Sequence, residues 1–199
     1  MGMRYPAEQK AETHEKILAA AARSFREHGS ENNGIGRVMK ELGLTKGGFY
    51  RHFKSKGDLY AKAVARAFEE MGNHEVAIAE TAPKGQELRA IIEDYLSPEH
   101  AGHPETGCPL ALMAGEFARQ PLEVRKRINQ SMVAFRERMV PYIPGADIEE
   151  KRRRFFVLFP GMAGTLVAAR AIVDPQRREL TLAAARSFYL ETFVPKREG

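Results

Sequence analysis

The chain lacks the features that disulfide-bonded and membrane-spanning proteins need. It has one cysteine among 199 residues, which excludes an internal disulfide and favours a reducing compartment. Its first residues contain no apolar signal region, and the charge-free stretch at residues 155–169 is shorter than the ~20 residues that cross a bilayer. We therefore expect a cytoplasmic protein that makes no membrane contact.

Signals for β-strands are also missing. No segment sustains an alternation of apolar and polar residues, and no Asn-Gly or Asp-Gly pair separates two β-branched runs. Apolar residues recur instead at helical spacing along most of the chain. The sequence therefore predicts an all-α fold, with helices that include residues 85–96, 108–119, 122–142, 147–173 and 175–193 and a polar loop at residues 97–107.

The positive charge is concentrated in one short segment. The whole chain has a formal net charge of +5, and residues 34–56 alone carry six basic side chains against one acidic side chain. The basic residues are Arg37, Lys40, Lys46, Arg51, Lys54 and Lys56. A basic patch confined to one element is typical of a nucleic-acid-binding face, whereas diffuse basic charge mainly affects solubility.

The same segment has the pattern of two short helices joined by a tight turn. Its first helix has apolar residues at i, i+3, i+4 and i+7, namely Ile35, Val38, Met39 and Leu42. Gly43 can adopt the left-handed conformation that ends a helix, and Thr45 is a good N-cap for the next one. In that second helix Phe49 and Phe53 face inward, and Ser55 then caps a further helix. This arrangement predicts a helix-turn-helix.

The outward side of the second helix has the chemistry of a DNA-reading surface. Lys46 and Arg51 can donate hydrogen bonds to guanine in the major groove, and Tyr50 and Lys56 are candidates for phosphate contacts. His52 fits either a phosphate contact or a structural hydrogen bond. The candidate DNA-binding residues are Thr45, Lys46, Gly47, Gly48, Tyr50, Arg51, His52 and Lys56.

The two adjacent glycines in that helix have two readings. They cost a helix roughly 2 kcal/mol relative to two alanines. They are therefore either tolerated weak points or positions where the backbone must approach DNA closely.

The run GLTKGGFYRHFKSKGDL, residues 43–59, resembles the DNA-binding signature of the TetR family of transcriptional regulators. Two later runs, GCPLALMAGEFARQPLEVR at residues 107–125 and LVAARAIVDP at residues 166–175, resemble segments of one TetR subgroup. The chain departs from the family pattern at Gly34, Met39 and Gly57.

The resemblance implies an N-terminal DNA-binding helix-turn-helix domain at residues 1–56. It also implies a C-terminal effector-binding and dimerisation domain at residues 57–199. In such a protein a small organic molecule releases a homodimeric repressor from a palindromic, double-stranded DNA operator. The candidate effector-binding residues are Met113, Phe117, Met132, Phe135, Phe159 and Met162.

The resemblance further implies that the last two helices form the dimer interface. Small residues that let helices approach closely, and apolar residues that add contact area, occur in both helices. They are Gly164, Ala168, Ala169, Ala171, Leu180, Ala184, Phe188 and Leu190.

Cys108 leaves other interpretations open. A thiol at a helix N-terminus can sense oxidants or electrophiles, although a buried structural cysteine is commoner. A metal-gated switch would need a site built from His100, His103 and Cys108, but their spacing matches no structural zinc motif, so we expect no metal and no cofactor. A Cys–His enzyme using Cys108 and His103 lacks an orienting partner and a glycine-rich loop, so we expect no catalysis.

Overall fold

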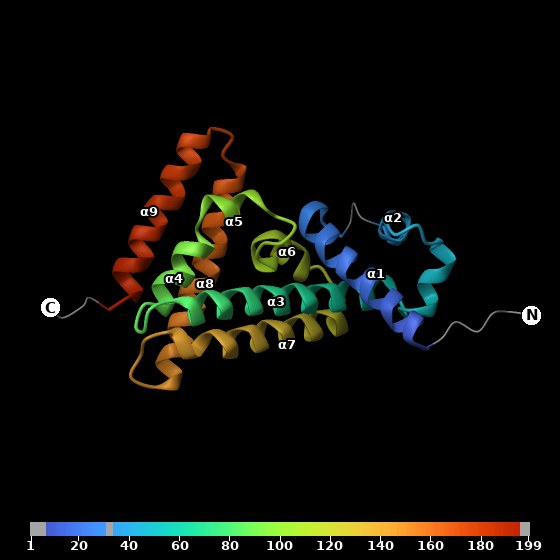
Figure 1. Ribbon diagram of the computed structural model, residues 1–199, viewed down its shortest axis with the longest axis horizontal. Helices are drawn as coiled ribbons and strands as arrows, with labels where there is room; N and C mark the ends of the chain where they lie inside the picture. The colour runs from blue at the N-terminus through green and yellow to red at the C-terminus, as the bar shows by residue number, and fades with distance from the viewer. Residues whose placement is uncertain (1–6, 31–33, 196–199) are drawn as a thin grey trace, which may run out of the picture.

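The computed structural model describes residues 7–30 and 34–195. This part of the chain folds entirely into helices and connecting loops, without a strand, which confirms the all-α prediction (Figure 1). The elements are α1 (Ala7–His28), α2 (Ile35–Glu41), the 3₁₀ helix η1 (Lys46–Arg51), α3 (Lys56–Thr81), α4 (Glu87–Tyr95), α5 (Pro98–Gly102), α6 (Pro109–Phe117), α7 (Leu122–Met139), the 3₁₀ helix η2 (Val140–Tyr142), α8 (Ile148–Ala171) and α9 (Pro175–Phe193). Among the helices of these described ranges, none combines the length and apolar character of a membrane span.

The N-terminal elements α1, α2 and η1 pack around a small group of apolar side chains. Ile17 and Phe25 of α1, Val38 of α2 and Phe49 of η1 are all buried. Gly43 follows α2 with a φ of +68°, the left-handed conformation expected of a glycine at a helix end. These contacts set the angle at which η1 leaves the turn.

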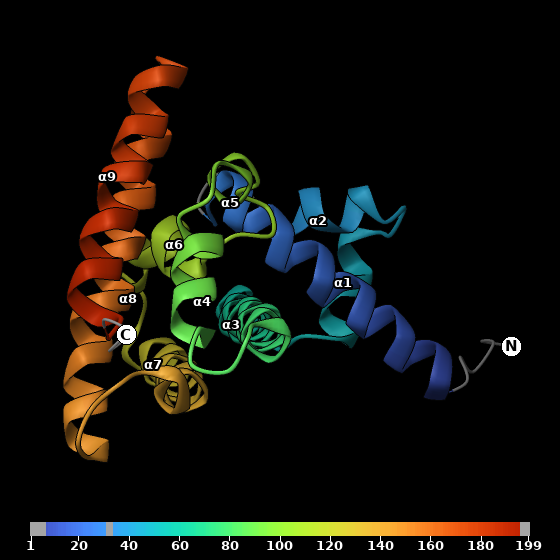
Figure 2. The same ribbon diagram turned by 60° about the vertical axis from the view of Figure 1, so that its left-hand side comes forward.

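Helix α3 is the axis of the molecule. Its first half packs against α1, and it lies beside α7 along much of its length (Figure 1). Helices α8 and α9 pack against each other and form the side of the molecule that faces away from α2 (Figure 2). The buried apolar residues form one continuous core from Ile17 to Val194, so the N-terminal elements share their core with the rest of the protein.

One sequence-based expectation was wrong. Residues 97–107 are not only loop, because they contain α5, whose first turn begins with Pro98 and whose N-cap Ser97 accepts a hydrogen bond from the His100 N–H at 3.0 Å. The expected second helix of the helix-turn-helix is present as a 3₁₀ helix of six residues. Its two adjacent glycines disfavour a longer helix, and a 3₁₀ helix is the geometry that short pieces adopt.

The start of α3 is held by Asp58. The Asp58 N–H donates to Ser55 Oγ at 3.0 Å, and Asp58 Oδ2 accepts from the Lys54 N–H at 3.2 Å. Asp58 Oδ1 accepts from Arg127 Nη1 of α7 at 3.0 Å. The neighbouring Gly57 also faces α7, and a Cβ atom there would lie 3.1 Å from Val124 Cγ2. Asp58 therefore both caps α3 and fixes it to α7.

We predict that Asp58→Ala lowers the free energy of unfolding by about 1–2 kcal/mol at pH 7. Burial acts to raise the pKa of Asp58, but the Lys54 N–H and the Arg127 guanidinium outweigh it and lower this pKa below its ordinary value. A carboxylate with a lowered folded-state pKa contributes its full stability above the unfolded pKa, and this contribution is lost as the pH falls through the folded pKa. Urea unfolding at pH 7 and below pH 4 measures the difference.

The matched control is Glu123→Ala, which removes an exposed carboxylate from the first turn of α7. It should change stability little at either pH. A cost of Asp58→Ala that persists undiminished in acid would show that the carboxylate charge is not what holds α3.

Candidate DNA-binding surface and effector cavity

The 3₁₀ helix η1 is positioned by a cap on one side and an aromatic pair on the other. Thr45 Oγ1 accepts a hydrogen bond from the Gly48 N–H at 3.3 Å, as expected of an N-cap. Phe49 and Phe53 are buried and stack with their ring centroids 5.5 Å apart. Because the inner side of η1 is anchored in this way, its outer side keeps a fixed orientation.

The outer side of η1 presents polar side chains to solvent. Lys46 and Arg51 are exposed. Tyr50 is 68% exposed, and its ring makes a T-shaped contact with that of Phe49 at a centroid distance of 5.1 Å. Thr45, at the N-cap of η1, is exposed too. Lys56 is exposed in the first turn of α3, where free backbone donors and the helix dipole favour an anion. Exposed basic side chains are thus contributed both by η1 and by the start of α3.

Nothing in the fold requires glycine at positions 47 and 48. Neither residue has a positive φ. A Cβ atom on Gly47 would meet no heavy atom within 4 Å, and one on Gly48 would make ordinary contacts at 3.5 Å and beyond. The missing side chains leave room on the outside of η1, where a DNA backbone can approach closely.

His52 sits at the edge of this surface. Burial lowers its pKa, and its neighbours His14, Lys10 and Arg51 lower it further. Its Nδ1 atom is buried and has no hydrogen-bond partner within the described residues. The ring therefore makes no structural hydrogen bond through that atom.

A cavity of about 360 Å³ lies between α3, α4, α6, α7 and α8. Its wall is mainly apolar and aromatic. The lining residues are Phe68, Tyr95, Cys108, Leu110, Asn129, Met132, Val133, Phe135, Arg136, Phe155, Phe156, Phe159 and Pro160. We call this space the effector cavity, after the role that is proposed for it below. In its wall the Phe135 and Phe159 rings pack edge to face with their centroids 5.3 Å apart. Phe159 also stacks on Phe155, with a centroid distance of 4.8 Å.

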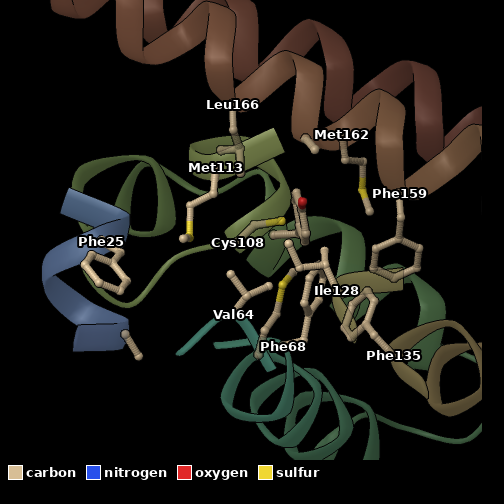
Figure 3. Close-up of a cluster of buried hydrophobic side chains, with 14 of the residues drawn as sticks. Phe25, Val64, Phe68, Cys108, Met113, Ile128, Phe135, Phe159, Met162 and Leu166 are labelled. Atoms are coloured by element: carbon tan, nitrogen blue, oxygen red, sulfur yellow. The ribbon is translucent and has the colours of Figure 1, made fainter. Parts of the chain in front are cut away.

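The candidate effector-binding residues divide between this wall and other places. Met132, Phe135 and Phe159 line the cavity. Met113 and Met162 lie in the packed core instead, as Figure 3 shows for both. Phe117 borders a shallower depression between α6 and α7. Helical spacing alone could not separate wall from core, because both require apolar residues on inward faces.

Several wall residues were not foreseen from the sequence. Phe68, Asn129 and Arg136 line the cavity but are not among the candidate effector-binding residues taken from the sequence. The signal that joins them is spatial: they come from α3 and α7, which lie side by side.

Cys108 lies at the centre of the buried cluster, between Val64 and Phe68 of α3 and Leu166 of α8 (Figure 3). Burial raises the pKa of its thiol, which disfavours the reactive thiolate. Its backbone N–H donates to His100 Nε2 at 3.0 Å. This environment is that of a structural cysteine.

His100 and His103 have separate partners. His100 Nδ1 lies 2.7 Å from the carbonyl oxygen of Tyr95, so with Nε2 accepting from Cys108 the neutral ring carries its proton on Nδ1. His103 is exposed and lies 3.0 Å from the carboxylates of both Glu99 and Glu105. Within residues 7–30 and 34–195, no three His, Cys, Asp or Glu side chains gather in a metal-binding group.

The outer side of the α8–α9 pair is apolar. On α8 the exposed positions include Val157, Pro160, Gly164, Val167, Ala168 and Ala171, and on α9 they include Leu180, Ala184 and Phe188. A Cβ atom on Gly164 would meet nothing within 4 Å, so the chain's own packing does not require glycine there. Ala169 and Leu190, expected on this side, pack inward against the protein's own core.

Comparison with known proteins bears on the surface formed by η1. Residues 17–63 match the family model described as bacterial regulatory proteins, tetR family. This match covers the last part of α1, all of α2 and η1, and the start of α3.

Residues 17–63 are a TetR-family DNA-binding segment.

The curated relatives are similar over the same region. An HTH-type transcriptional regulator of Staphylococcus aureus strain USA300 is 34% identical over 85 residues, which is 43% of this chain and 46% of that protein. A second such regulator, from S. aureus strain NCTC 8325, matches to the same extent. The matched part of the chain thus spans about half the length of these relatives.

Solved TetR structures share the whole fold. A TetR regulator from Chloroflexus aurantiacus superposes with a TM-score of 0.73 at 23% identity, over 94% of this chain and all of that one. The reduced form of NemR from E. coli gives a TM-score of 0.76 at 15% identity, over 94% of this chain and all of that one. At these identities the likeness concerns the fold.

We predict that Gly47→Ala separates stability from DNA binding. Alanine is the better helix residue and has room here, so the free energy of unfolding should stay the same or rise by up to about 1 kcal/mol. A methyl group on the outside of η1 should weaken binding to the DNA directly upstream of the protein's own coding region at least fivefold. Thermal melts and fluorescence anisotropy measure the two effects.

Gly115→Ala is the matched control, since it adds the same methyl group to an open helical position in α6, away from η1. It should leave DNA binding unchanged. Undiminished binding by Gly47→Ala would mean that the backbone of η1 does not approach DNA closely.

Proposed function

We propose that this protein is a homodimeric transcriptional repressor of the TetR family that occupies a palindromic operator and leaves it when a small apolar molecule fills the effector cavity. Residues 1–56 read DNA, with Lys46 and Arg51 contacting base edges and Tyr50 and Lys56 contacting phosphates. Residues 57–199 bind the effector and dimerise.

One observation carries this proposal: the effector cavity and the DNA-reading surface share helices. Phe68 lines the cavity from α3, the helix whose first residue is Lys56. Met132 and Phe135 line it from α7, which is joined to the start of α3 by the 3.0 Å contact between Arg127 and Asp58. A change in the spacing of α3 and α7 therefore reaches the phosphate-contacting end of α3 directly.

A second connection runs through α6. Leu110, near the start of α6, lines the cavity, and Glu116, near its end, accepts a hydrogen bond from the Ser30 N–H at 3.0 Å. Ser30 follows α1, and its hydroxyl group also donates to Glu116. A Cβ atom on Gly29 would lie only 2.6 Å from Glu116 Oε1, so this contact is tightly packed. Movement of α6 is thereby coupled to the end of α1.

These two connections give the effector a means of acting. An effector shifts an equilibrium only by binding one arrangement better than the other. A molecule that fits the cavity best when α7 and α6 are displaced favours a dimer whose two η1 helices no longer match successive major grooves. Effector binding then lowers operator affinity by the same factor by which operator binding lowers the affinity for the effector.

The cavity wall indicates the class of effector. At about 360 Å³ it lies at the small end of ligand sites, and its aromatic wall suits a compact apolar or aromatic molecule. The hydroxyl group of Tyr95 is buried at this wall beside the thiol of Cys108, and it offers one polar position that a matching group on the molecule would use. FadR from Bacillus subtilis, solved in complex with stearoyl-CoA, shares the fold with a TM-score of 0.63 at 19% identity, over 91% of this chain and 97% of that one.

Dimerisation is proposed to use the apolar outer side of α8 and α9. Leu180 and Phe188 are more than 60% exposed, and with Ala184 they form a stripe at i, i+4 and i+8 on α9. A twofold axis through this surface would pair each helix with its copy, and it would place one η1 on each half-site of a palindrome.

The release step is tested by filling the cavity. We predict that Met132→Trp keeps operator binding within twofold of wild type but no longer releases DNA with compounds that release the wild type, because the indole occupies their space. Fluorescence anisotropy with the upstream duplex, titrated with a library of small apolar and aromatic compounds, gives both readouts.

Leu122→Trp is the control, because it adds an indole at an exposed position of α7 outside this cavity. The double variant Tyr50→Ala with Lys56→Ala supplies the baseline for lost DNA binding. Release of Met132→Trp by the same compounds at the same concentrations would contradict an effector site in this cavity.

We also predict that Leu180→Glu with Phe188→Glu converts the dimer to a monomer, since four carboxylates would be buried in one isologous interface. Sedimentation velocity reports the mass, and operator affinity should fall at least a hundredfold. Leu122→Glu introduces a carboxylate at an exposed leucine elsewhere and should leave the dimer intact. A double variant that remains dimeric would locate the interface on another surface.

A further inference from the structure

A second cavity, of about 420 Å³, lies where α1 meets α3, α4 and α5. Unlike the effector cavity, it is lined mainly by polar and charged side chains. Its lining residues are Ala19, Arg23, Arg26, Glu70, Met71, His74, Glu75, Asp94, Ser97, Glu99, His100, His103 and Thr106. We call it the junction cavity, because α1 contributes to the DNA-reading end of the protein and α4 and α5 belong to the opposite end.

Arg26 brings buried, unpartnered hydrogen-bond donors to the wall of this cavity. Its side chain is only 1% exposed, and its Nη2 atom donates to Glu70 Oε2 at 2.8 Å. Its Nε and Nη1 atoms are buried and find no acceptor within the described residues. Glu70 cannot supply a further acceptor easily, because its other oxygen accepts from Arg66 Nε at 2.8 Å.

Glu75 brings an unused acceptor. The residue is 1% exposed, and its Oε2 atom is buried without a partner in the part of the chain that the structure describes. Burial raises the pKa of Glu75 well above its ordinary value, and the nearby carboxylate of Asp94 raises it further. No cation of the described residues lies within ion-pair distance of this carboxyl group.

The other charged groups around the cavity already have partners. His74 Nε2 lies 2.7 Å from Asp94 Oδ2, and Arg23 Nη2 lies 3.4 Å from Glu41 Oε1. Glu99 is paired with His103. The groups left over are therefore a guanidinium with two free donors and a carboxyl group with a free acceptor, in one cavity large enough for a small molecule.

We propose that the junction cavity binds a small zwitterion, an amino-acid-like molecule whose carboxylate accepts from Arg26 and whose ammonium group pairs with Glu75. Buried polar groups in native proteins nearly always have a partner, and leaving one without a partner is costly. A ligand with one anionic and one cationic end satisfies both groups at once. A ligand with a single charge satisfies only one.

The positions of the two groups bear on the length of the molecule. Glu70, which holds Arg26, and Glu75 are five residues apart on α3, or about 7.5 Å along the helix axis. Candidate ligands therefore range from α-amino acids to ω-amino acids with a few methylene groups. Such a molecule would join α1 to α3.

Isothermal titration calorimetry with the purified full chain, without DNA, tests the site. The zwitterionic probes are glycine, 4-aminobutyrate, 6-aminohexanoate and L-lysine. Butyrate and n-butylamine are the matched probes for 4-aminobutyrate, since each keeps one charged end. We expect at least one zwitterion to bind, and its single-charge counterparts to bind at least tenfold more weakly.

The variants assign the two ends of the ligand. Glu75→Gln keeps the shape of the side chain but removes its charge, and it should weaken zwitterion binding at least tenfold. Arg26→Lys should do the same. Glu80→Gln, the same change at an exposed position of α3, should leave binding unaltered.

Three results would overturn the proposal: no zwitterion binding at millimolar concentration, equal binding of butyrate or n-butylamine, or unchanged binding by Glu75→Gln. If Arg26→Lys fails to fold, the single-charge probes and the Glu75→Gln variant still test whether the cavity binds a zwitterion. Because none of these measurements involves operator DNA or the effector cavity, their outcome is independent of the proposed repressor function.

Discussion

The structure depends on how completely α3 is surrounded. Leu59, Val64 and Ala67 are fully buried, and the helix packs against α1, α4, α6 and α7. Its first turn is fixed at the same time by the Ser55 cap and by the contact of Asp58 with Arg127. A helix packed on so many sides cannot move alone. A displacement of its neighbours is therefore transmitted to its first turn, where the side chain of Lys56 is exposed to solvent.

The N-terminal elements could be predicted in detail because their signals are local. Gly43, Thr45 and Ser55 act through backbone conformation and short-range hydrogen bonds, and each took the expected role. Phe49 and Phe53 were expected to face inward, and both are buried. The local pattern did not specify the type of helix at residues 46–51, which is 3₁₀.

The cavities could not be predicted, because they arise from contacts between elements distant in sequence. Met162 and Phe159 occur in the same helix with the same apolar character, yet one is core and the other is cavity wall. Arg26 and Glu75 are 49 positions apart and carry no motif, so only the packing of α1 against α3 brings them to one cavity. Helix α5 was missed for a related reason: Ser97 and Pro98 are a start signal, but the five-residue helix that follows lies within a polar segment that reads as loop.

The continuous core has a consequence for recombining proteins of this kind. Phe25 of α1 packs against Tyr60 of α3 with ring centroids 5.6 Å apart, and Ser30 is held by Glu116 of α6. A chimera that takes residues 1–56 from another protein would keep the peptide connection to α3. It would replace Phe25 and Ser30 but retain their partners Tyr60 and Glu116. A stable chimera would therefore also need the matching residues on the facing sides of α3 and α6 from the same donor protein.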